Sequence, residues 1–466
     1  FHAEPGIPAP LWSRGLGDVY KRQRMNQNTD FIQSEWLPPD DPQRELLHNV
    51  VHTRQSQRIH LPALVVYIAV LSNDITLGQE CEHLRRLPGQ EGLTVDHLQH
   101  NFLRLRLQGY ALRWERHTEF TSYTLVQQLP ESAQLGATDP DLLSSLVLPN
   151  GWLTGIPGRT FAAIKLVMVH GNLKSPEEML LSARNWFGER PIVASLVGRN
   201  SRSLVVTDFM LRDSGFERML VIAPPTISVT GAGRIAQRLL EIETYRVMAL
   251  RGLPVAKKLD SELANSEQQL ASITDQLKNK ITSEQELLDR LVALAVDMER
   301  ITIEHMYRFT ATRAYDKMIT QRITELKEKA IPGTQIIGEF MWHRLSPAIA
   351  KVEDTAQRMG SLSERISHTS ALLRTQVNIL TEAQNQQLLE KLTRGQELQL
   401  RLQRTVEGLS IAAISYYVVS LILYLTKAGK AAGLLVHPEL VTGVMIPLVL
   451  LVVWRITRRI QNKLLK

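Results

Sequence analysis

The sequence contains a single cysteine, Cys81, among 466 residues. One cysteine can form neither an intramolecular disulfide nor a cysteine-based zinc cage. The sequence also lacks the common phosphate-loop, dinucleotide-binding, zinc-protease and serine-hydrolase motifs: Gly-x-x-x-x-Gly-Lys-Ser/Thr, Gly-x-Gly-x-x-Gly, His-Glu-x-x-His and Gly-x-Ser-x-Gly. These absences indicate a protein that is not an enzyme of a common class, and they point to no particular cofactor.

A strong charge of one sign is also missing. The formal net charge is +7 for 54 basic and 47 acidic residues. This excess is modest, and many of the basic residues flank two apolar segments near the C-terminus, where membrane topology explains them. We therefore expect no nucleic-acid partner.

Two apolar segments lie close to the C-terminus, at 408–426 and 440–455. The first has no charged residue over about the length that spans a bilayer. Arg401 and Arg404 precede the first segment, and a basic tail, 456–466, follows the second. Because cytosolic loops of membrane proteins are enriched in Lys and Arg, the pattern predicts a transmembrane hairpin of the inner-membrane type. Both termini would be cytosolic and the loop 427–439 external.

The segment 231–407 is predicted to be a helical stalk. Apolar residues recur at steps of three, four and seven, and no proline occurs between Pro347 and Pro438. This spacing is typical of a coiled coil or a helical bundle, and one helix can run directly into the first apolar segment. A single long helix cannot bury such a stripe alone, so we expect a homo-oligomer formed through the stalk.

The segment 44–230 reads as a cytosolic α+β head domain with a mixed or antiparallel sheet. Helices are expected at 77–87 and 175–187, and Gly198 begins a turn that makes its two flanking strands antiparallel. Strands are expected at 63–71, 107–114, 120–127, 161–169, 192–197, 203–210 and 219–222. Residues 25–43 are expected to form a flexible N-terminus. Residues 1–24 resemble translated sequencing adapter and are interpreted as a non-native extension.

The strongest chemical candidate is the run from Arg113 to Phe120. Alternation along one strand would place Glu115, His117 and Glu119 on one face and Arg116 on the other. An imidazole between two carboxylates could act as a general base, and His117 with Glu119 could contribute to a metal site. The alternative is a structural ladder of polar side chains with arginine partners, which is the commoner arrangement in sheets.

A second candidate is a group of arginines around the expected turn. Arg199, Arg202 and Arg212 could form an anion pocket, whereas Asp208 and Asp213 could instead pair with them as surface ion pairs.

Four stretches resemble one proteobacterial family of uncharacterised membrane-anchored proteins, a domain of unknown function. They are Arg-x-x-Leu-x-Asn-x-Val-His at 44–52, LRWERHTEF at 112–120, GRIAQRLLEIETYR at 233–246 and TVEGLS-x-x-AISYY at 405–417. The resemblance covers nearly all of 44–455. It implies attachment to a membrane, and it brings no known activity.

We therefore predict a membrane-anchored, oligomeric cytosolic scaffold or regulatory protein. One alternative is an ion channel or transporter whose layout is similar to that of magnesium and cobalt channels. Against it, the Gly-Met-Asn signature of that group is absent, and Lys427 and Lys430 make the external loop cationic. The other alternative is a membrane-tethered, metal-dependent hydrolase using His117 and Glu119.

Overall fold

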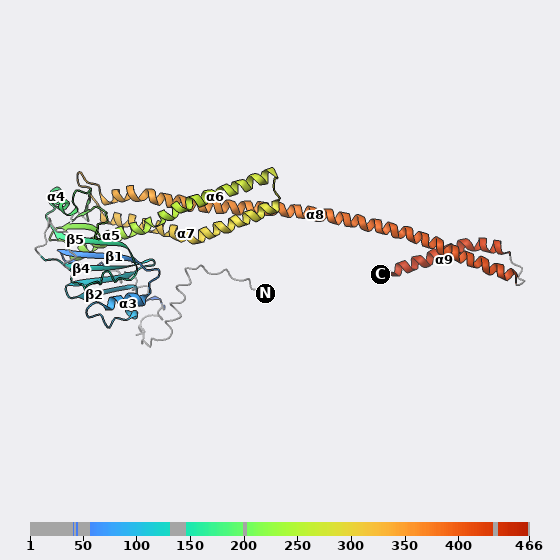
Figure 1. Ribbon diagram of the computed structural model, residues 1–466, viewed down its shortest axis with the longest axis horizontal. Coiled ribbons are helices and arrows are strands. Elements are labelled where there is room, and N and C mark those ends of the chain that lie inside the picture. The colour runs from blue at the N-terminus through green and yellow to red at the C-terminus, as the bar shows by residue number, and fades with distance from the viewer. Residues whose placement is uncertain are drawn as a thin grey trace. The chain divides into compact units, whose positions relative to one another are not determined.

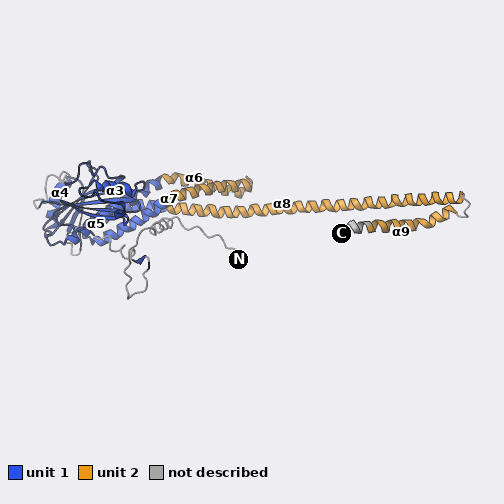
Figure 2. Cartoon of the chain, turned by 90° about the horizontal axis from the view of Figure 1, so that it is seen from below, with its two compact units in different colours: residues 1–257, 307–354 blue, residues 258–306, 355–466 orange. Residues whose placement is uncertain are grey.

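The computed structural model describes residues 41, 43–44, 56–130, 146–198, 203–431 and 437–464 (Figure 1). The chain divides into two compact units (Figure 2). Unit 1 comprises residues 1–257 and 307–354, and unit 2 comprises 258–306 and 355–466. Three helices contribute residues to both units: α6 (Gly252–Asn279), α7 (Glu284–Leu326) and α8 (Ile337–Ala431).

Unit 1 is built on a mixed eight-stranded sheet of order β2-β3-β4-β1-β5-β8-β7-β6. Neighbouring strands are antiparallel except β5 and β8, which are parallel. The strands are β1 (Ala63–Leu71), β2 (Phe102–Leu107), β3 (Tyr110–Arg116), β4 (Phe120–Gln128), β5 (Arg159–His170), β6 (Val193–Val197), β7 (Ser203–Thr207) and β8 (Glu217–Ala223).

The expected strands all appear, and the predicted antiparallel pairing of β6 with β7 is confirmed. Strand β2 was not predicted. Its sequence, FLRLRL, alternates apolar residues with arginine, and it lies at the edge of the sheet beside β3.

Both faces of the sheet are covered, which is why β1 is apolar at nearly every position. One face packs against α3 (Leu77–Arg85), α4 (Pro176–Phe187) and the segment around Trp152. A capping box between Thr76 and Gln79 begins α3. Pro176 occupies the first turn of α4, although the side chain of Ser175 makes no capping hydrogen bond.

The opposite face packs against α5 (Val229–Leu250) and against residues of α7 and α8. Even-numbered residues of β1 contribute to the first core and odd-numbered ones to the second, as the two-residue repeat of a strand requires. Helix α5 had been expected at the beginning of the stalk, but its apolar side chains complete the core of unit 1.

In unit 2 the described parts of α6, α7 and α8 bury apolar side chains at helical spacing. Leu263 and Leu270 on α6, Leu291 and Leu294 on α7, and Leu362 on α8 are all at most 3% exposed. Arg358 on α8 forms ion pairs with Asp260 and Glu267 on α6. The apolar stripe expected in the stalk is divided between α6 and α7 here, because the chain leaves the helical conformation around Lys280, whose φ is 50°.

Helix α8 is continuous for 95 residues, and α9 (Pro438–Leu464) follows it. Both contain a stretch long and apolar enough to cross a membrane by length and composition. Only 6% of that window in α8 and 17% of that in α9 is buried. These low fractions differ from those of a soluble core helix, which buries its apolar residues, and they suggest association with a membrane.

Candidate functional site

The predicted cluster around His117 does not lie on one strand. Strand β3 ends at Arg116, and residues 117–119 form the turn to β4. The amide of His117 donates a hydrogen bond to the carbonyl oxygen of Phe120 at 2.7 Å and closes this turn. The expectation of one strand face carrying Glu115, His117 and Glu119 was therefore wrong, because the chain reverses direction between the first of these residues and the last.

Glu119 binds side chains of α7. Arg308 donates hydrogen bonds to both carboxylate oxygens, at 2.6 and 3.1 Å, and the hydroxyl of Tyr315 donates to Oε2 at 2.9 Å. Glu119 and Arg308 are 8% and 14% exposed at their side chains. Burial and the neighbouring carboxylate raise the pKa of Tyr315, so its hydroxyl remains a donor. The carboxylate thus anchors the β3–β4 turn to α7.

Glu115 and Arg116 project to opposite faces of the sheet, as alternation predicts. Arg113 Nη2 lies 2.6 Å from Glu115 Oε2, and the guanidinium also stacks over the ring of Phe102. On the other face, Arg116 donates to Glu80 of α3 at 2.8 Å. Burial raises the pKa of Glu80, although Thr121 and Arg116 oppose the shift.

His117 lies in the turn between β3 and β4. Its ring stacks on Phe120 with centroids 4.3 Å apart. Within the described ranges, no group of three or more His, Cys, Asp or Glu side chains is placed to hold a metal ion. The roles suggested for Glu115, His117 and Glu119 in catalysis, and for the last two in metal binding, stay predictions.

A small cavity lies between the sheet and α5, and we call it the inner cavity. Its walls come from β1, β3, β4, α5 and the segment that precedes β1. The volume of the cavity that the centres of water molecules can occupy is about 40 Å³. The polar lining includes Gln57, Tyr67, Arg113, Glu115, Gln237 and Glu241.

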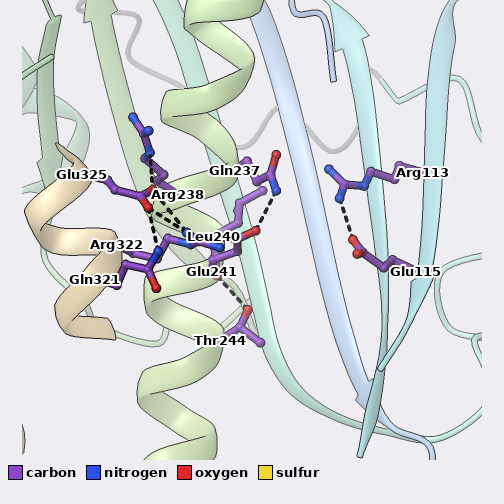
Figure 3. A network of polar contacts seen from close by, with 10 residues as sticks. All are labelled: Arg113, Glu115, Gln237, Arg238, Leu240, Glu241, Thr244, Gln321, Arg322 and Glu325. Atoms are coloured by element: carbon purple, nitrogen blue, oxygen red, sulfur yellow. Dashed lines mark hydrogen bonds and ion pairs between the residues drawn. The ribbon is translucent and has the colours of Figure 1, made fainter. Parts of the chain in front are cut away.

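A polar network borders this cavity on α5 (Figure 3). Gln237 Nε2 donates to Glu241 Oε1 at 2.7 Å, and the other oxygen of Glu241 accepts a short hydrogen bond from Arg322 of α7. Arg322 and Arg238 both bind Glu325. Figure 3 shows the Arg113–Glu115 pair on strand β3, across from this network. Each charged group that the figure draws is therefore matched by an opposite charge.

Among the described residues that line the inner cavity, three side chains keep polar atoms without partners. Among the described residues, neither amide atom of Gln57 has a hydrogen-bond partner, although Gln57 is only 6% exposed. Gln237 Oε1 and Arg113 Nε are likewise buried and unpartnered within that part of the chain. Buried polar atoms are nearly always hydrogen-bonded, so these atoms mark the cavity as a candidate binding site.

Gln57 is held in place by its backbone. Ile59 donates a backbone hydrogen bond to Val229 at 3.1 Å, and the carbonyl oxygen of Gln57 would lie 1.7 Å from a Cβ placed on Gly233. Only glycine permits this approach of the segment to α5. No motif marked Gln57 or Tyr67 in the sequence; Gly233 and Gln237 were noticed only as part of the family-like stretch at 233–246.

A second, wider pocket adjoins the inner cavity, and we call it the outer pocket. Its solvent-accessible space is about 410 Å³, and its polar lining includes Asn101, Arg116 and Thr118. His117, Phe120 and Tyr245 line both spaces. The stacked His117 and Phe120 rings thus stand at the boundary between the two.

The arginine candidates lie elsewhere. Arg199 and Arg202 are outside the described residues. Arg212 forms a short ion pair with Asp208 and also donates to the carbonyl oxygen of Phe187 at 3.3 Å. The Arg212 guanidinium therefore already has partners within the fold. The anion-pocket role of the three arginines stays a prediction.

Comparison with known proteins places the chain in a family. Residues 39–464 match the family described as Protein of unknown function (DUF3422). The chain belongs to this family. No curated protein and no solved structure matches it. The DUF3422 match covers both units and the two apolar helical stretches, and the family description assigns no activity.

Proposed function

We propose that this DUF3422 protein is a membrane-anchored scaffold or regulatory protein of a bacterial inner membrane, with unit 1 in the cytosol and self-association through α8. The observation that carries the proposal is the exposure of the apolar stretches in α8 and α9. Large apolar side chains such as Leu421 and Leu448 are 63% and 56% exposed. Lipid tails would cover these surfaces without any further protein.

Self-association rests on the part of α8 that precedes its apolar stretch. Leu388, Leu392, Leu398 and Leu402 are 59–67% exposed there. A lone helix leaves such a stripe of leucines exposed to water. Parallel copies of the helix, anchored in one membrane, would bury the stripe against each other. The partner we propose is therefore a second copy of this chain.

The two other predicted functions lack a supporting observation. The apolar stretches 408–426 and 440–454 contain no Asp, Glu, Lys, Arg or His, which are the residues that mark many transport pathways. For a metal-dependent hydrolase, Glu119 is occupied by Arg308 and Tyr315. Neither a pore nor metal-dependent hydrolysis is proposed.

Extraction with alkaline carbonate tests the anchor. The chain should stay in the membrane pellet. Leu421→Arg or Leu448→Arg should shift it towards the soluble or degraded fraction, because each arginine at the centre of a span costs about 2.5–3.5 kcal/mol. Leu388→Arg, outside both stretches, is the matched control and should leave the pellet fraction unchanged. Release of the unmodified chain by carbonate would disprove the anchor.

Cysteine cross-linking tests self-association, since Cys81 is buried. Leu388→Cys should give a disulfide-linked dimer in membranes under oxidation. Glu390→Cys, about 200° around the helix, should give much less. Equal yields at both positions would count against a specific interface on this face of α8.

A further inference from the structure

The unpartnered polar atoms of the inner cavity define what the cavity can bind. Gln57 offers a donor and an acceptor, Arg113 Nε offers a donor, and Gln237 Oε1 offers an acceptor. The orientation of the Gln237 amide follows from its Nε2, which donates to Glu241. A molecule that satisfies all of these atoms carries an acceptor and a donor side by side.

The charges around the cavity restrict the ligand further. Arg113 pairs with Glu115, and Glu241 pairs with Arg322. An added charge would therefore lose its hydration without gaining an unpaired counter-charge, which is costly in a buried site. A neutral ligand avoids this cost.

The volume and the apolar walls of the inner cavity fit a small chemical group. At roughly 10–15 Å³ for each water centre, 40 Å³ corresponds to about three or four non-hydrogen atoms. Ile59, Val65 and Leu240 supply apolar contacts beside the polar atoms. The outer pocket, which shares His117 with the cavity, leaves room for the rest of a longer molecule.

We propose that the inner cavity binds a neutral carboxamide, either a small amide or the amide end of a longer molecule. The carbonyl oxygen of the ligand accepts from Gln57 Nε2 and Arg113 Nε, and its amino group donates to Gln57 Oε1 and Gln237 Oε1. The site lies wholly in unit 1, so it does not depend on the proposed anchor or on self-association.

Ligand-observed NMR on the full chain in detergent micelles tests this site, with acetamide and acetate as an isosteric pair of probes. Acetamide should show saturable transfer from the protein, and acetate, which has the same shape but a charge and no amino donor, should show none. Equal signals from both probes, or no signal from acetamide, would overturn the proposal; in the latter case the cavity holds water alone.

Paired variants locate the binding. Gln57→Leu should weaken acetamide binding at least tenfold, whereas Gln99→Leu, on an exposed turn, should not change it. Gln57→Leu removes two unsatisfied buried atoms, so its melting temperature should equal or exceed that of the unmodified chain. If Gln57→Leu does not fold, Gln237→Leu gives the same readout. Unchanged acetamide affinity in the folded variant would disprove the assignment.

Discussion

Glu119 illustrates how one side chain connects segments that are remote in sequence. It lies 189 residues before Arg308, and the two form a bidentate ion pair beside the hydroxyl of Tyr315. The sequence places Glu119 next to His117, and this adjacency suggested acid–base chemistry. The fold instead directs the carboxylate towards α7, where an arginine satisfies it.

Removing this carboxylate should destabilise unit 1. Glu119→Ala leaves Arg308 buried without its partner, and we expect a loss of about 3 kcal/mol in the free energy of unfolding. Chemical denaturation followed by tryptophan fluorescence measures it. The matched control is Glu353→Ala, since the Glu353–Arg313 pair is about half exposed and spans 3.6 Å; it should change stability by less than about 0.5 kcal/mol. Similar losses in both variants would contradict the anchoring role of Glu119.

A second buried carboxylate, Glu217, is a source of pH dependence. Burial and the nearby carboxylate of Glu243 raise the pKa of Glu217 from 4.5 to about 9, while Arg246, 3.6 Å away, opposes the shift. The folded state therefore keeps a proton that the unfolded state releases above pH 4.5. The stability contributed by this group is fully present below pH 4.5 and decreases as the pH rises towards 9.

The substitution Glu217→Gln tests this dependence, because glutamine imitates the protonated carboxyl at every pH. Between pH 5 and 8 the unmodified chain should lose stability with a slope of at most about 1.4 kcal/mol per pH unit from this group. The variant should show a flatter profile and be the more stable of the two at pH 8. Denaturation midpoints across this range measure the difference, and parallel profiles would show that Glu217 is ionised in the folded protein.

At the scale of elements, α5 determines the inner cavity. The helix covers one face of the sheet with Ala232, Leu239 and Ile242, and the segment before β1 crosses it at Gly233. Tyr67 of β1 and Thr244 of α5 are hydrogen-bonded at 2.9 Å, which fixes the helix against the central strand. The polar atoms of the cavity keep their positions because both walls are held in this way.

A methyl group at the crossing point should disturb this arrangement. Gly233→Ala would place Cβ 1.7 Å from the carbonyl oxygen of Gln57, and we expect a loss of about 3 kcal/mol, measured by thermal or chemical denaturation. Gly395→Ala on α8 is the control, because no atom lies within 4 Å of its added Cβ. It should gain up to about 1 kcal/mol in helix stability. Equal effects of the two substitutions would show that the close approach at Gly233 does not exist in solution.

At the scale of the whole molecule, the continuity of α8 links residues of unit 1 to the first apolar stretch. Helix α8 begins at Ile337, contributes Met341 to the second core of unit 1, and continues to Ala431. Arg401 and Arg404 precede the apolar stretch, and Arg455, Arg458 and Arg459 follow that of α9. This distribution is the basis for expecting both ends of the hairpin on the cytosolic side.

Reporter fusions measure this topology. A reporter that is active only in the cytosol should be active when it is joined after Lys466. A reporter that is active only outside the cytosol should be active when it is inserted at His437. A charge change provides the control: Lys427→Glu with Lys430→Glu makes the loop more acidic and should leave the orientation unchanged. A cytosolic signal from the His437 insertion would refute the hairpin.

Much of the fold could be predicted from local pattern. The expected strand at 63–71 has the same bounds as β1, and the helix at 175–187 differs from α4 by one residue. Strand β2 was missed because an edge strand with alternating arginine lacks the apolar run of a central strand. The candidate site was only partly predicted: Glu115 and His117 line the inner cavity, whereas Glu119 does not.

The sequence by itself determined the elements and the apolar stretches, because hydrophobic periodicity, turn residues and flanking charges are local properties of the chain. The tertiary structure alone decided which charges neutralise one another and which polar atoms remain unpartnered. Arg308 reaches Glu119, Arg322 reaches Glu241, and Gln57 lies against Gly233 across 81 to 189 residues of chain. No spacing in a single sequence encodes such pairs, since they arise only when α5 and α7 pack on the same face of the sheet.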